Sequence, residues 1–205
     1  MKHIFKKGIN SRTLLLLHGT GGDEHDLIPI AKMIDDEASV LSVRGNVLEN
    51  GMPRFFKRLQ EGIFDEEDLI MRTHELDNFI SLASEKYGFN RNNVVAIGYS
   101  NGANIAGSIL FHNIGSLKGA ILLHPMVPRL GIKLPNQTGT DVFIGASIND
   151  PFSSVEETKE LGTCLVNLMR VLNTIGDKVD IVYQMMRLKQ QKNGIVSIII
   201  SRILR

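Results

Sequence analysis

Short apolar runs alternate with longer amphipathic stretches along most of the chain. The apolar runs predict buried strands over residues 13–17, 38–43, 93–99, 117–123 and 141–146, with a last strand over 179–183. Apolar positions at helical spacing predict helices over residues 24–35, 66–87, 101–112 and 154–175. Strands that alternate with helices indicate an α/β fold with a mostly parallel sheet covered by helices on both faces. We expect one such domain over residues 1–184.

Residues 44–65 follow neither the helical nor the strand period. They contain three glycines, one proline and the pair Phe55-Phe56. We expect an irregular loop here, and a loop of this length inside a compact domain is usually functional.

A serine lies at the turn between a predicted strand and a predicted helix. Residues 98–102 read Gly-Tyr-Ser-Asn-Gly and match the pattern G-x-S-x-G. So sharp a turn strains the serine backbone and admits only small neighbours, which accounts for Gly98 and Gly102. The helix N-terminus adds a partial positive charge beside the attacking oxygen. We interpret Ser100 as a nucleophile; the alternative is a serine that caps a helix after a glycine-rich turn.

A glycine-rich turn follows the first predicted strand. Residues 17–22 read Leu-His-Gly-Thr-Gly-Gly. In hydrolases with a nucleophile elbow, one backbone N–H from such a loop and one from the residue after the nucleophile bind the oxyanion. These would be Thr20 and Asn101, while His18 and Gly19 would support the loop. The alternative is a phosphate-binding loop, but neither G-x-x-x-x-G-K-[ST] nor G-x-G-x-x-G is present.

An acidic residue follows a late predicted strand. Asp150 stands in residues 148–151, Ile-Asn-Asp-Pro, shortly after the strand over 141–146. The chain order nucleophile, acid, histidine places the acid of a catalytic triad at such a position. The alternative is an ordinary Asn-Asp-Pro turn.

These motifs together resemble the phospholipase/carboxylesterase branch of the α/β-hydrolases, which also holds the acyl-protein thioesterases. Residues 41–51 and 64–69 further resemble the Firmicute carboxylesterases associated with hydroquinone and quinone stress, and the resemblance extends to about residue 184. It implies a cytoplasmic, cofactor-free serine hydrolase of small carboxylic esters, often a homodimer. Residues 44–65 would then line the substrate pocket, with the candidates Arg44, Phe55, Phe56 and Phe64. For the phenylalanines, a place in the core is an equal alternative.

The family's general base is a histidine in a Gly-His motif after the last strand. The chain has six histidines, and none follows Asp150. A serine hydroxyl is a weak nucleophile without a base, and removing a triad member leaves roughly 10³–10⁴-fold catalysis over water. His124 follows the strand over 117–123, and we expect it to support the site rather than replace the base.

The tail differs from the body in its charge. Residues 185–205 carry five basic residues and no acid, so the other 184 residues have a net charge of −4. Residues 194–201 are prone to β-structure and aggregation and lack the period of a closing helix. We hypothesise that a frameshift after about Gln184 replaced the segment that bears the histidine.

Composition excludes several classes of partner. The net charge of +1 favours neither nucleic acid nor an anionic membrane surface. The apolar stretches are far shorter than the roughly 20 residues that span a bilayer. The single cysteine, Cys164, allows no internal disulfide, which fits a reducing cytosol. No metal site is predicted. Three functions remain: a serine carboxylesterase weakened by the missing histidine, a non-catalytic relative that binds acyl or aromatic ligands, and an acyl thioesterase or lysophospholipase.

Overall fold

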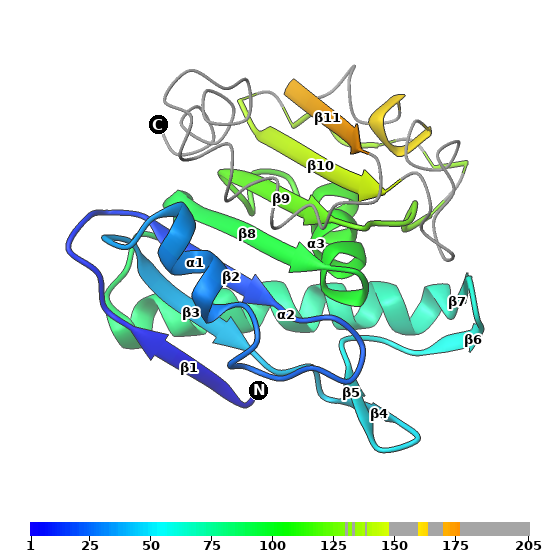
Figure 1. The fold of residues 1–205 in the computed structure, drawn as a ribbon, viewed down its shortest axis with the longest axis horizontal. Coiled ribbons are helices and arrows are strands. Elements are labelled where there is room, and N and C mark those ends of the chain that lie inside the picture. Colours follow the sequence, from blue (N-terminus) through cyan, green and yellow to red (C-terminus); the bar gives the residue numbers. More distant parts are fainter. Residues whose placement is uncertain (130, 133, 138, 148–159, 164–169, 177–205) are drawn as a thin grey trace.

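A seven-stranded sheet forms the centre of the molecule (Figure 1). The computed structural model describes residues 1–129, 131–132, 134–137, 139–147, 160–163 and 170–176. The strands are β1 (His3–Lys6), β2 (Thr13–Leu17), β3 (Ser39–Val43), β8 (Val94–Tyr99), β9 (Gly119–Leu123), β10 (Asp141–Ser147) and β11 (Arg170–Gly176). Their order is β1-β3-β2-β8-β9-β10-β11, and every pair is parallel except β1 with β3.

Helices cover both faces of this sheet, as the sequence predicted. Helix α1 (Ile28–Ile34) lies on one face, and α2 (Glu66–Tyr87) and α3 (Asn101–His112) lie on the other (Figure 1). Side chains alternate between two core clusters along β2, β3, β8, β9 and β10. Leu14 and Leu16 of β2 pack with α1, whereas Leu15 and Leu17 pack with α2 and α3. The continuous apolar strands therefore reflect burial on both sides.

Helix α2 begins and ends where local signals place it. The Asp65 side chain accepts a hydrogen bond from Asp68 N at 3.1 Å, which caps the first turn. The helix ends at Gly88, whose φ of 69° is the left-handed conformation that glycine adopts without strain. A short 3-10 helix, η1 (Arg91–Asn93), then leads into β8.

The irregular loop predicted over residues 44–65 is wrong, because the structure forms two hairpins there. They are β4 (Val47–Glu49) with β5 (Met52–Arg54), and β6 (Arg58–Gln60) with β7 (Ile63–Phe64). The first turn is Asn50-Gly51, with φ of 51° and 79°. Positive φ at both central residues is the geometry that makes Asn-Gly a strong hairpin turn, and this signal was readable in the sequence.

Two further predictions of secondary structure need correction. Strand β1 was not predicted, and the predicted helix over 154–175 is wrong over its last part, because β11 pairs in parallel with β10 there. Without β11, β10 would present unpaired backbone groups at the edge of the sheet, and β-branched residues such as Val171 and Ile175 favour a strand that pairs with them. Asp150, Cys164, the predicted strand over 179–183 and the tail over 185–205 lie outside the described residues.

No helix within the described ranges is long and apolar enough to cross a bilayer.

Candidate active site

Three neighbouring strands bring the sequence motifs to one edge of the sheet. β8 lies between β2 and β9, and all three run parallel, so the turns after them meet at their carboxyl ends. Ser100 follows β8, and its backbone N–H donates to Leu123 O of β9 at 2.8 Å. Ligands of open parallel sheets bind at this edge.

The turn at Ser100 is strained and tightly packed. Ser100 has φ 49° and ψ −112°, a backbone conformation that residues with side chains rarely adopt. A Cβ atom on Gly98 would lie 2.5 Å from Gly102 O and 2.6 Å from Ala103 Cα. A Cβ atom on Gly102 would lie 2.6 Å from His18 O and nearer still to the Leu17 carbonyl. Both glycines are therefore required by close backbone approach, and the side chain of Ser100 is half-buried at the turn.

His18 is bonded through both ring nitrogens to backbone. Its Nδ1 lies 2.6 Å from Gly19 O, and its Nε2 accepts from the Gly45 N–H at 3.0 Å. This network assigns the proton to Nδ1, which then donates to Gly19 O. Burial lowers the pKa of His18, which favours the neutral ring that these two bonds require. His18 thus joins the loop after β2 to the segment after β3.

The backbone N–H groups of Thr20 and Asn101 lie in the turns that follow the paired strands β2 and β8. Asn101 is the first residue of α3, and the first turn of a helix leaves its N–H groups without helical partners. Within the described part of the chain, neither the Asn101 nor the Thr20 N–H donates to a protein acceptor. Thr20 is exposed in the loop after β2, which pairs directly with β8.

The four candidate substrate-binding residues lie in different environments. Phe55 and Phe56 are 1% and 0% exposed and belong to the core cluster beneath α2 and α3, which is the alternative that the sequence left open. Phe64 is partly buried and packs edge-on against Phe56 at a ring distance of 5.0 Å. The Arg44 guanidinium binds the carboxylates of Glu24 and Asp23.

Sequence reasoning missed two residues at this edge. Tyr99 is 39% exposed, and its ring lies between the backbone of Gly19 and the ring of His124, whose centroid is 5.4 Å away. Arg54 is only 4% exposed and donates from Nη1 to Thr20 Oγ1 at 2.8 Å. The motif G-x-S accepts any residue at position 99, so it does not single out Tyr99. A single arginine in a predicted loop likewise does not single out Arg54.

His124 also has an unusual backbone. Its φ is 52°, and its N–H donates to Gly145 O of β10 at 2.7 Å. The chain turns here directly beside Ser100, since Leu123 is the partner of the Ser100 N–H. Asp150, the predicted acid, lies outside the described residues. Among the residues that the structure does describe, no group of three or more His, Cys, Asp or Glu side chains is arranged to hold a metal ion.

Comparison with known proteins decides the family. No family model matches the chain. MhqD of Bacillus subtilis strain 168, a hydrolase by name, is 62% identical over 161 residues, which are 78% of this chain and 80% of MhqD. A crystal structure of the Bacillus cereus carboxylesterase is 55% identical with a TM-score of 0.88, and the match covers 93% of this chain and 94% of that one. The chain belongs to the carboxylesterases of the α/β-hydrolase type.

A more distant carboxylesterase, from Mesorhizobium loti, is 28% identical with a TM-score of 0.78, and the match covers 91% of each chain. The expected α/β-hydrolase fold is therefore confirmed, as is the expected membership of a carboxylic ester hydrolase family. In this chain, the strained turn at Ser100 lies at the junction of β8 and α3.

Proposed function

We propose that the chain is a serine carboxylesterase for small esters, with Ser100 as nucleophile and with turnover limited by a missing base. The observation that carries the proposal is the Ser100 backbone, whose positive φ persists only where the surrounding structure imposes it. Such strain exposes the hydroxyl above the sheet at the edge where ligands bind.

The oxyanion of the tetrahedral intermediate would be bound by the N–H groups of Thr20 and Asn101. Both groups lack protein acceptors among the described residues, and both follow strands that pair with each other. Each such donor typically contributes about 3–4 kcal/mol to transition-state stabilisation. Asp150 would be the acid, and His18, Gly19, Gly98, Gly102 and His124 would support the site. Of the candidate pocket residues, Phe64 and Arg44 keep partial exposure.

In this proposal, no histidine of the sequence serves as the general base. None of the six histidines follows Asp150, so Ser100 lacks the partner that the family supplies. We propose that the tail over 185–205, which has five basic residues and no acid, results from a frameshift. Sequencing the gene tests this: a tail that is in frame in close relatives and has no histidine contradicts it.

Three further expectations belong with this proposal. The substrate is a small carboxylic ester, the location is the cytoplasm, and the chain forms a homodimer without binding nucleic acid. The single cysteine and the near-neutral charge support the location and the lack of nucleic-acid binding. Size-exclusion chromatography with light scattering tests the dimer.

The decisive experiment combines labelling and chemical rescue. A fluorophosphonate probe, read by intact mass, should add one label to the wild type and none to Ser100→Ala. Free imidazole should accelerate both labelling and ester hydrolysis in the wild type, because it replaces the absent base. Subtracting the Ser100→Ala rate removes hydrolysis by imidazole in solution. If neither protein is labelled and both hydrolyse the ester at equal rates, the serine mechanism is contradicted. The remaining hypothesis is then a non-catalytic relative that binds acyl or aromatic ligands.

A second pair of measurements separates the remaining alternatives. His124→Gln should retain the imidazole-stimulated rate if His124 only supports the site, whereas loss of the unstimulated rate alone would identify His124 as a substitute base. Comparing a short ester with its thioester separates a carboxylesterase from an acyl thioesterase.

A further inference from the structure

Residues 53–55 lie at the end of β5 and just after it. Each of them contacts either the loop after β2 or the first residue of α3. Pro53 O accepts from the Gly21 N–H at 3.0 Å, and Arg54 Nη1 donates to Thr20 Oγ1 at 2.8 Å. The Phe55 N–H donates to the side-chain Oδ1 of Asn101 at 2.8 Å. We call residues 53–55 the strap. It joins the loop after β2 to the first residue of α3.

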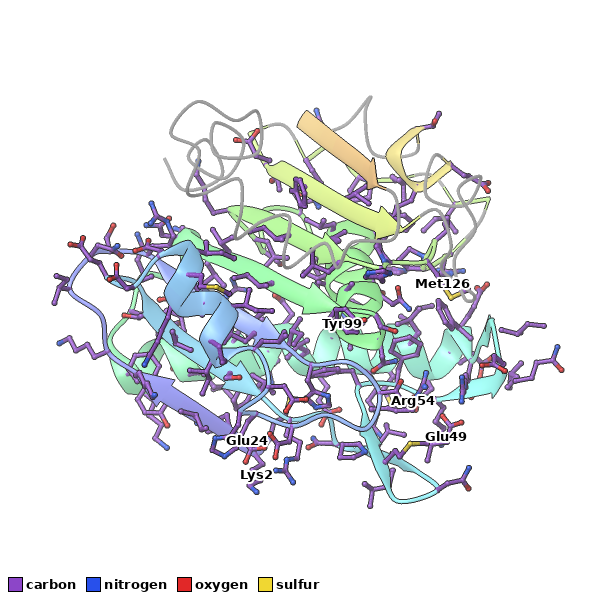
Figure 2. The ribbon with its side chains drawn as sticks, in the orientation of Figure 1. Lys2, Glu24, Glu49, Arg54, Tyr99 and Met126 are labelled. Atoms are coloured by element: carbon purple, nitrogen blue, oxygen red, sulfur yellow. The ribbon has the colours of Figure 1, made fainter. Side chains whose placement is uncertain are left out.

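Arg54 makes the charged contacts of the strap. Its guanidinium is buried, and besides Thr20 it binds Phe56 O at 3.2 Å and the Glu49 carboxylate at 3.1 Å. In Figure 2, Arg54 lies between Glu49, on the β4–β5 hairpin, and the end of β8 where Tyr99 is labelled. Hydrogen bonds from a charged donor are the stronger ones, and a planar guanidinium with several fixed partners has little freedom to move.

We infer that Arg54 is a positioning residue, which holds the Thr20 loop so that the Thr20 and Asn101 N–H groups point at one oxyanion. The inference rests on the proposed serine mechanism for its catalytic consequence, although the contacts themselves do not depend on it. The stretch 44–65 thus acts through its backbone and one buried cation, rather than only as a pocket wall. The Glu49 carboxylate pairs with Arg54 and orients its guanidinium.

The chain offers a matched control for this role. Arg58 binds the same Glu49 carboxylate at 2.8 Å, but no contact joins it to Thr20 or Asn101 within the described residues. Arg58→Met therefore removes an arginine of β6 that shares Glu49 with Arg54 but has no direct contact with the strap in the described structure. Arg54→Met removes the bond to Thr20, and Arg54→Lys keeps the charge but not the planar fork.

Amide hydrogen exchange tests the strap without any need for turnover. The Gly21 N–H, bonded to Pro53 O, should exchange roughly tenfold faster in Arg54→Met, because a hydrogen bond to a charged group holds the loop. Arg58→Met should leave Gly21 exchange within about twofold of the wild type. Thr20→Val, which removes Oγ1 but keeps the backbone N–H, should match Arg54→Met, and Thr20→Ser should match the wild type.

Kinetics then test the positioning role. In the presence of imidazole, Arg54→Met should lower kcat by about 10- to 100-fold with little change in KM, since small misplacements at a reacting centre have effects of this size. Arg54→Lys should recover part of kcat, and the double variant with Thr20→Val should be no slower than either single variant. Unchanged Gly21 exchange, or a kcat loss no larger than in Arg58→Met, overturns the inference. If the wild type instead equals Ser100→Ala, the serine mechanism fails, and the exchange data alone decide the strap.

Discussion

Replacing Gly102 by alanine probes the packing of the strained turn most directly. The new Cβ atom would meet His18 O at 2.6 Å, whereas ordinary van der Waals contact begins at 3.4 Å. The first turn of α3 would have to move away from β2 by more than about 0.8 Å, because the Leu17 carbonyl is nearer still and these backbone atoms have no rotamer to change. Overpacking of this kind costs about 1–3 kcal/mol, and the missing freedom to relax favours the upper half of that range.

Gly107 supplies the matched control on the same helix. A Cβ atom there would lie 3.0 Å from the Pro128 ring and in ordinary contact with the Leu122 side chain. Alanine is favoured over glycine inside a helix by about 0.5–1 kcal/mol, which offsets a mild contact. We therefore expect the free energy of unfolding of Gly107→Ala to lie within about 1 kcal/mol of the wild-type value. For Gly102→Ala, we expect it to be lower by about 2–3 kcal/mol.

Urea unfolding followed by circular dichroism measures both differences. In thermal unfolding, Gly102→Ala should lower Tm by roughly 4–12 °C for a domain of this size. The same shift separates Asn101 from the Thr20 loop, so fluorophosphonate labelling of Ser100 should slow by about 100-fold. Equal stability of the two variants would refute the argument, because both carry the same Gly→Ala change and differ only in what the new atom meets.

Three other predictions follow from single contacts. Ser100→Gly should be more stable than Ser100→Ala by about 1–3 kcal/mol in urea unfolding, because only glycine relieves the positive φ; equal stabilities would mean that the turn is unstrained. Asn101→Ala leaves the buried Phe55 N–H without its acceptor, so it should lose about 1–3 kcal/mol by the same assay, whereas a neutral change would mean that this bond contributes little. Burial alone would raise the pKa of Glu24, but hydrogen bonds from its own backbone, Arg44 and Lys2 lower it to about 2. The ionised carboxylate thus stabilises the fold above pH 4.5 and loses this effect as the pH falls through about 2, so Glu24→Gln should be less stable than wild type at pH 7 and equal to it near pH 2.

Where the sequence predicted structure well, the deciding signals were local. Helix α2 has the predicted bounds because Asp65 and Gly88 cap it, and α3 begins where the G-x-S-x-G turn must end. Strands β2, β3, β8, β9 and β10 were readable because each is a mostly apolar run buried on both faces. Likewise, the sharpness of the turn predicted both glycines of the motif, although the atoms that Gly102 approaches belong to the distant Leu17 and His18.

Where the sequence predicted poorly, the missing information was non-local. β1 is a half-buried edge strand whose register against β3 no short pattern reveals. The local sequence of β11 fits a helical pattern, and it forms a strand because it pairs with β10. Arg54 is informative only once folding places it against Thr20, 34 positions earlier in the chain.

The contacts that hold Ser100, Gly102 and Thr20 in the described part of the structure come from residues that precede β10. Ser100 is held by Leu123, Gly102 by the end of β2, and Thr20 by Arg54. The proposed acid, Asp150, comes later in the chain, as does the position of the histidine motif that the family resemblance implies. Strain at Ser100 of about 1–3 kcal/mol is thus held by contacts from the earlier, described residues. A change confined to the residues after Gln184 would remove the base yet leave this geometry in place. Imidazole supplies a base from solution, so the rate that it restores measures how well the Ser100 turn and the Thr20 and Asn101 N–H groups support ester hydrolysis.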